Sequence, residues 1–190
     1  MHKKLLLIIF SLILLVGSSV YSGSVYSGEA KITDLIVTNT RDDLLIYLNL
    51  KDAFTEKVEK SILSGLTADF SFNILLNKTR NFWPDKEMAD INVVHSIKYN
   101  NLKKEFNVTR SWDKNKLVVT ESFMEARKLM SEINSLKVAP LNKLEKGVHY
   151  QIRAKAKISQ KTLPFYLHYI LFFVSWWDFE TDWYTIDFIY

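Results

Sequence analysis

The last 28 residues, from Leu163 to Tyr190, hold 12 of the 26 aromatic side chains, and this concentration constrains the fold more than any other feature. An aromatic side chain buries roughly 150–250 Å² when it is packed. No earlier segment of this length carries comparable apolar area. The tail must therefore pack against the rest of the chain or contact lipid, and the sequence leaves both readings open.

The composition is that of a single globular domain. The chain has 190 residues, of which 48% are hydrophobic and 24% are charged. The formal net charge is +4, and Lys3 and Lys4 supply two of those charges, so there is no electrostatic footprint for nucleic acid. The absence of cysteine excludes disulfides, thiolate zinc sites, a thiol nucleophile and the acylated cysteine of a bacterial lipoprotein.

The N-terminus has the layout of a secretory signal peptide. Lys3 and Lys4 precede an apolar run over residues 5–16, and small and polar residues follow. As a helix this run would span about 18 Å, short of the roughly 30 Å hydrocarbon core, which favours a cleaved signal over an anchor. The tetrapeptide VYSG occurs twice, and either Ser22 or Ser27 could end the signal. We expect a signal peptide over 1–27, a single domain over 28–190, and export to a bacterial periplasm or envelope.

Alternating apolar and polar side chains predict β-strands over most of the mature chain. Turn-forming residues separate the strands with short connections, which indicates antiparallel pairing. The predicted strands are 31–38 and 44–51 as a hairpin, 66–79, then 91–99, 102–112 and 116–120 as a meander, and 148–158.

Two segments have apolar residues at helical spacing. The first predicts a helix over 53–64, with Asp52 as N-cap and Gly65 as C-terminal stop. In the second, Ser122 and Glu125 form a capping-box pattern that predicts a helix ending near Leu136, followed by a brief extended piece over 138–141. Strands in this number with two inserted helices predict a mainly β protein, an antiparallel β-sandwich or open barrel.

Several short motifs follow one another in a fixed order. They are the helix end at Ser64-Gly65, a tryptophan at Trp83, the turn over 99–102, the helix start over 122–126, a strand that runs into Leu163-Pro164, and the closing aromatic segment 177–184. In this order they resemble a bacterial family of exported proteins catalogued as a domain of unknown function, family 4390. The resemblance covers nearly the whole mature chain. It implies an exported single domain and assigns no activity or site residue.

The sequence contains no signature of a reaction. His95 lies on the apolar face of a predicted strand and is expected to pack, while His149 and His168 have no His, Asp or Glu at a metal-ligand interval. There is no GxSxG, no HExxH and no glycine-rich phosphate loop. We therefore expect no metal, no cofactor and no nucleotide.

Two clusters are candidate interaction surfaces. The first is the basic row Arg153, Lys155 and Lys157 on one face of a strand, which could meet lipid head groups or an acidic partner, or could be a solvated face that protects an edge strand. The second is an acidic and aromatic cluster in the tail. Its members are Trp176, Trp177, Asp178, Glu180, Asp182 and Trp183.

Three uses of the second cluster stay open. Tryptophan planes beside carboxylates suit a sugar-binding cleft, because a ring stacks on the apolar sugar face while an acid accepts hydroxyl protons. The acidic spacing could also bind calcium, although the glycine and the final glutamate of an EF-hand loop are missing. The third reading is a set of core aromatics with a solvated acidic edge.

The functional hypothesis is a non-catalytic exported protein that binds another envelope protein, a glycan or the membrane surface. One alternative is a glycan-processing protein that uses Asp178, Glu180 or Asp182. Another is a protein held at a membrane surface or in the outer membrane by its tail, since the alternation in 184–190 resembles a closing barrel strand. We expect 163–173 to pack as a strand or short helix, and 183–190 to close the sheet.

Overall fold

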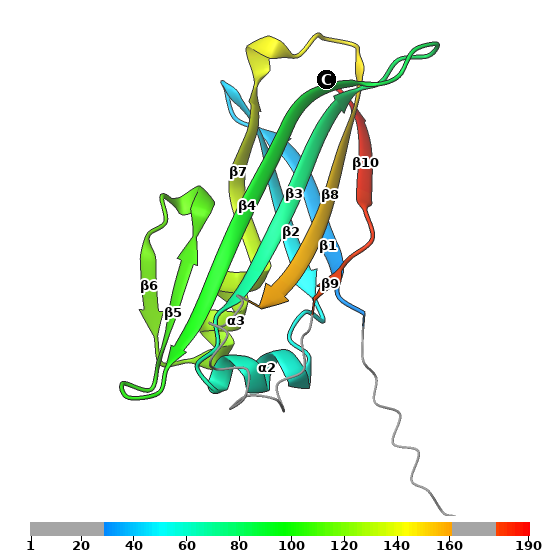
Figure 1. The fold of residues 1–190 in the computed structure, drawn as a ribbon. Helices are drawn as coiled ribbons and strands as arrows, with labels where there is room; N and C mark the ends of the chain where they lie inside the picture. The colour runs from blue at the N-terminus through cyan, green and yellow to red at the C-terminus, as the bar shows by residue number, and fades with distance from the viewer. Residues whose placement is uncertain (1–28, 161–177) are drawn as a thin grey trace, which may run out of the picture.

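A computed structural model describes residues 29–160 and 178–190, which form two antiparallel sheets that pack face to face (Figure 1). The predicted β-sandwich is thereby confirmed. The segment 163–173, expected to be a strand or short helix, lies outside the described residues. Within the described part of the chain, no helix has the length and apolar character needed to cross a membrane.

The smaller sheet has three strands in the order β1-β2-β7. Its strands are β1 (Lys31–Asn39), β2 (Asp43–Lys51) and β7 (Glu132–Pro140). The first two form the predicted hairpin. Only the end of β7 was predicted, as the extended piece over 138–141, because its first half was assigned to the preceding helix.

The larger sheet has the order β10-β8-β3-β4-β5-β6, with β9 paired to β8. Its strands are β3 (Ala68–Lys78), β4 (Lys86–Asn100), β5 (Glu105–Arg110), β6 (Leu117–Thr120), β8 (His149–Gln160), β9 (Phe179–Glu180) and β10 (Tyr184–Ile189). Strand β3 is the predicted strand over 66–79, and strands β4 to β6 form the predicted meander. Strand β10 pairs with β8, which confirms that the end of the chain closes a sheet.

The core lies between the two sheets and follows from the alternation in each strand. Every second residue of β3, such as Phe70, Phe72 and Ile74, is fully buried. Tyr150 and Ile152 of β8 are also fully buried on the inner side of the same sheet. Buried residues of β2 complete the same hydrophobic cluster from the opposite sheet. One continuous core therefore spans both layers.

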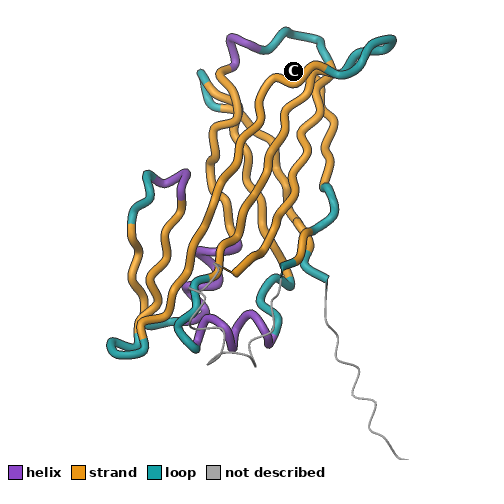
Figure 2. Tube along the Cα trace, in the orientation of Figure 1, coloured by secondary structure: helices purple, strands orange, loops and turns teal. Residues whose placement is uncertain are grey.

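The two α-helices that the structure describes lie at one end of the sandwich, and Figure 2 shows long loops at the other end. They are α2 (Glu56–Leu63) and α3 (Phe123–Ser131), and two 3-10 turns, η1 (Ser111–Asp113) and η2 (Leu141–Lys143), complete the fold. Helix α2 is capped by Thr55, whose hydroxyl accepts the Val58 N–H at 3.4 Å. The predicted cap Asp52 is wrong, because that residue has a φ of 58° in the preceding turn. Gly65, with a φ of 88°, ends the helix as predicted.

Helix α3 begins at the predicted Ser122 cap but ends at Ser131 rather than near Leu136. The reason is a bulge in β7. Ile133 pairs with Leu48 while Leu136 pairs with Ile46, so β7 has one more residue than β2 between these pairs. The extra residue turns the usual strand spacing of two into a spacing of three, which imitates a helical pattern.

Candidate interaction surface

The basic row Arg153, Lys155 and Lys157 lies on the outer face of β8. The residues between them, Ala154 and Ala156, are fully buried, so the alternation directs the three cations outward. Strand β8 lies between β3 and β10, each of which pairs with it. The interpretation of this row as protection for an edge strand is therefore wrong, because β8 is an interior strand.

Strand β9 places an acidic side chain of the tail against this row. The register aligns Glu180 with Lys157, and the Glu180 carboxylate forms an ion pair with Lys155 and lies 3.8 Å from the Lys157 ammonium. The hydrogen bond and the charge of Lys155, together with the charge of Lys157, lower the pKa of Glu180. The two predicted clusters thus form one surface, and its carboxylate is held in the ionised form.

Thr181 anchors this contact, and sequence reasoning missed it. The Thr181 N–H donates to the Ala156 carbonyl oxygen at 2.8 Å, and the Ala156 N–H donates to the Thr181 hydroxyl at 3.0 Å. Thr181 is buried. A single residue thereby satisfies both backbone groups of Ala156, a role that nothing in the sequence around Thr181 indicates.

Trp183 lies under the cations of the row rather than in open solvent. The Arg153 guanidinium is 4.6 Å from the centroid of the indole ring, and the Lys155 ammonium is 5.8 Å from it. Cations at these distances are attracted by the ring quadrupole. The indole is 36% exposed, so the ring is partly covered by cations where a sugar would otherwise stack.

The two aspartates of the acidic and aromatic cluster take no part in the ion pairs of the basic row. Asp178 and Asp182 are exposed and form no ion pair with a residue that the structure describes. Trp176 and Trp177 lie outside the described residues. The structure therefore brings Glu180 and Trp183, but neither aspartate, into contact with the basic row.

Charge on this surface is unevenly compensated. Lys155 and Lys157 share Glu180, whereas Arg153 forms no ion pair within residues 29–160 and 178–190. Strand β3 contributes Asn73 beside Lys155, and the Asn73 amide donates to Asp90 at 2.9 Å. The outer face is thus a polar surface on which the Arg153 guanidinium lacks a carboxylate partner among the described residues.

Apart from this surface, a concave region lies between the end of β2 and α3. It has a volume of about 350 Å³, and both acidic and basic side chains line it. Its Arg127 guanidinium lies over the rings of Phe54 and Phe123 and forms an ion pair with Glu59 at 3.1 Å. Arg127, one of the cations that line this pocket, is therefore already held by contacts within the protein.

Within the described ranges, no three His, Cys, Asp or Glu side chains are placed to hold a metal ion. His95 is fully buried, as its place on the apolar face predicted.

Comparison with known proteins gives one match. A family model described as Domain of unknown function (DUF4390) matches residues 27–187. No curated protein and no solved structure matches the chain. The matched span contains the whole surface formed by β8, β9 and Trp183.

Proposed function

The chain belongs to the DUF4390 family, and we propose that it is an exported, non-catalytic binding protein of the cell envelope whose partner engages the outer face of β8. The observation that carries this proposal is the Arg153 guanidinium, which lies over Trp183 without a carboxylate partner among the described residues. We call the set Arg153, Lys155, Lys157 and Trp183 the β8 surface. Its partner carries anionic groups.

The β8 surface is organised before a partner arrives. Glu180 holds Lys155, and the indole of Trp183 supports Arg153. A free lysine or arginine carries about 2 kcal/mol of rotamer entropy, part of which binding would otherwise remove. Side chains that are already ordered lower the cost of association.

Arg153 determines the chemistry of the partner. A guanidinium presents a planar fork of donors that matches a carboxylate or a phosphate with two hydrogen bonds. A similar stack occurs at Arg110, 5.0 Å from the Trp112 ring centroid, but Arg110 forms an ion pair with Asp113 at 2.8 Å. The comparison favours Arg153 as the position that an external acid would occupy.

Export is supported by the sequence of the first 27 residues. A charged start and an apolar run precede the family match, which begins at residue 27, where the expected signal peptide ends. The partner is accordingly sought among components of the envelope.

Glycan processing is the less favoured function. A glycosidase requires one carboxyl group with a raised pKa to protonate the leaving group. Lys155 and Lys157 lower the pKa of Glu180, which is the opposite condition. Glu180 is therefore suited to holding lysines in place and unsuited to donating a proton.

Binding to a soluble polyanion tests the proposal without lipid. The variant R153Q/K155Q/K157Q should bind dextran sulfate at least about tenfold more weakly, and the remaining binding should depend less on salt. The control K98Q/K103Q/K104Q removes the same charge from the end of β4 and the turn that follows it, and should bind as the unmodified chain does. R153K should also weaken binding, because lysine lacks the planar fork. Equal losses in the two triple variants would contradict a localised surface.

A further inference from the structure

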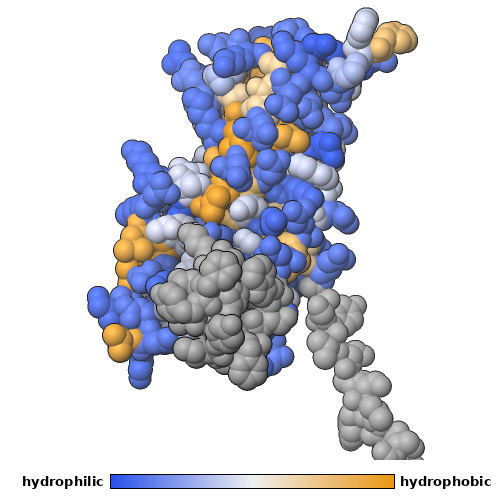
Figure 3. Space-filling model, in the orientation of Figure 1, coloured by the Kyte–Doolittle hydropathy of each residue, from blue (hydrophilic) through white to orange (hydrophobic). Residues whose placement is uncertain are grey.

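The loop between β3 and β4 projects beyond the sandwich at the end opposite the two helices (Figures 1 and 2). It carries two adjacent aromatic residues in full view of solvent. Phe82 is 94% exposed and Trp83 is 75% exposed, whereas Trp183 of the β8 surface is 36% exposed. Figure 3 shows a hydrophobic patch at the tip of this loop. Large apolar side chains left in water together usually mark a contact surface.

Defined contacts hold the loop in this position. The Arg80 N–H donates to the Asp85 carboxylate at 3.1 Å, which ties together the two sides of the tip. At the base, the Thr79 N–H donates to the His149 carbonyl oxygen at 3.0 Å. Pro84 restricts its own φ and the conformation of Trp83. These constraints hold the two rings away from the core rather than letting them fold back onto it.

Basic side chains lie in the loop and at its base, together with the carboxylates of Asp85, Glu87 and Glu145. Lys78 forms an ion pair with Glu145 at 2.6 Å, so the segment before β8 lies beside the base of the loop. The register of β3 and β4 pairs Lys78 with Lys86, so Lys86 lies at the base of the loop as well. Arg80 and Lys86, in the loop and at its base, form no ion pair with a described residue, and neither do Lys143 and Lys146 at the same end of the molecule.

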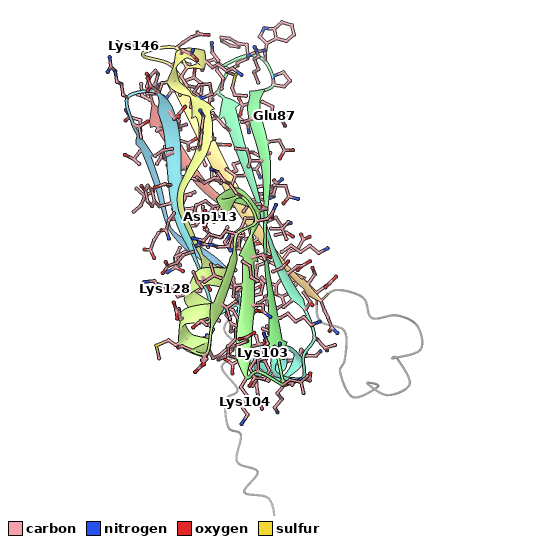
Figure 4. The ribbon with its side chains drawn as sticks, turned by 90° about the vertical axis from the view of Figure 1, so that its left-hand side faces the viewer. Glu87, Lys103, Lys104, Asp113, Lys128 and Lys146 are labelled. Carbon is pink, nitrogen blue, oxygen red and sulfur yellow. The ribbon has the colours of Figure 1, made fainter. Side chains whose placement is uncertain are left out.

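Exposed lysines lie at both ends of the molecule. Figure 4 shows Lys146 at the end that carries this loop, and Lys103 and Lys104 at the opposite end. The turn at that opposite end contains Leu102, which is 96% exposed. It offers a matched control, because it also combines an exposed apolar side chain with two lysines but lacks aromatic residues.

We propose that the β3–β4 loop docks the protein on a membrane, with Phe82 and Trp83 inserted at the lipid interface and Arg80 and Lys86 on anionic head groups. Tryptophan concentrates at membrane interfaces because its ring is apolar and its N–H is polar. Basic side chains beside such an anchor are attracted to anionic lipid. The loop projects from the sandwich and carries two adjacent exposed aromatic residues, which suits a deformable bilayer better than a preformed protein groove. This inference does not depend on the function of the β8 surface.

A single attached fluorophore tests the docking directly. The chain has no cysteine, so N81C places one environment-sensitive dye beside the two aromatics, and K103C places the same dye at the opposite end. The full chain is expressed in bacteria, exported and purified for this purpose. With vesicles of phosphatidylethanolamine and phosphatidylglycerol, the dye at position 81 should shift to the blue and be quenched by brominated lipid. The dye at position 103 should change in neither respect.

Substitutions then identify the groups responsible. F82S/W83S should lower vesicle affinity by about tenfold or more, since membrane binding scales with the apolar area inserted. Both residues are exposed in a turn, so the fold should be retained, and L102S should bind vesicles as the unmodified chain does. R80Q/K86Q should weaken binding and reduce its dependence on salt.

Several results would overturn the proposal. If F82S/W83S binds vesicles as well as the unmodified chain does, the loop is not the anchor. A dye response at position 103 instead of 81 would assign docking to the other end. Binding to phosphatidylcholine vesicles that is as strong as binding to the anionic vesicles would show that the cations do not contribute to docking. If the emission of the dye at position 81 does not change with vesicles but shifts when lipid-free envelope proteins are added, the loop binds a protein and not the membrane.

Discussion

The Trp112 indole N–H donates a hydrogen bond to Nε2 of His95 at 2.9 Å, and Nδ1 of the same imidazole lies 2.9 Å from the Met130 carbonyl oxygen. Because Nε2 accepts and the carbonyl can only accept, the imidazole is neutral with its proton on Nδ1. Its ring centroid is 5.0 Å from that of Phe72. A single buried histidine therefore connects β4 with η1 and α3.

Acid should destabilise the fold through His95. Burial, the largest cause, lowers the pKa of His95 from 6.5 to about 4, with the Met130 carbonyl raising it and Arg110 lowering it. The unfolded chain binds the proton more readily, so the stabilisation is complete above about pH 6.5 and is lost as the pH falls toward 4. Urea midpoints across this range should reveal a loss of about 3 kcal/mol. H95Q should abolish most of this dependence of stability on pH. The control H149Q changes an exposed histidine and should preserve the dependence. An H95Q variant that loses as much stability in acid as the unmodified chain would contradict the role of His95.

Replacing the hydrogen-bond donor should move this transition. W112F removes the N–H that stabilises the neutral imidazole, so the pKa of His95 should rise and the loss of stability should begin at a higher pH. The unsatisfied Nε2 should also lower the free energy of unfolding by about 1–3 kcal/mol at neutral pH. An NMR titration of the imidazole protons measures the pKa. An unchanged pKa would show that the Trp112 bond does not select the neutral form.

Thr181 should contribute more to stability than its position in an exposed segment suggests. T181V keeps the shape of the side chain but leaves the buried Ala156 N–H without its acceptor, which should cost about 1–3 kcal/mol. T185V changes an exposed threonine of β10 and should stay within about 0.5 kcal/mol. Chemical unfolding gives both values, and hydrogen exchange at Ala156 gives the local effect. Equal stabilities would contradict the anchoring role.

Deletion of the chain after Asp182 should unfold the domain. The deletion removes β10, whose Phe188 ring lies 5.9 Å from that of Tyr150, and exposes the backbone of β8. Ile186, Phe188 and Tyr190 pack against the core, and losing side chains of this kind costs about 2–5 kcal/mol each when they are buried. That loss is comparable with the 5–15 kcal/mol that stabilises most domains. A truncated chain with a cooperative thermal transition near that of the full chain would refute this role for β10.

Local patterns predicted most of the fold because strand burial follows a simple alternation. For the face of β3 that contains Phe70 and Phe72, the alternation predicted correctly which side chains are buried. The bulge around Ser135, which has a φ of 60°, was not readable, because it gives a strand the spacing of a helix. A bulge is determined by the partner strand and therefore by contacts far away in the sequence.

The surface was predictable only in part for a related reason. Alternation alone identified the outward face of Arg153, Lys155 and Lys157. The ion pair of Lys155 with Glu180 and the stacking of Arg153 on Trp183 join residues about 25 to 30 positions apart, and no local pattern encodes them. The sequence of a strand also does not say whether the strand lies at an edge, which is why the role of the row as edge protection was wrong.

The most direct test of the β8 surface is an NMR titration that follows the Arg153 side-chain N–H and the Trp183 indole N–H while dextran sulfate is added. The two signals should shift together and saturate at the same polyanion concentration, because the guanidinium lies over that ring. The Trp112 indole N–H, bonded to buried His95 beside an arginine that already has a carboxylate partner, should not shift. Unchanged Arg153 and Trp183 signals at a concentration that binds the chain, or equal shifts at Trp112, would contradict the proposal that the β8 surface receives an anionic partner.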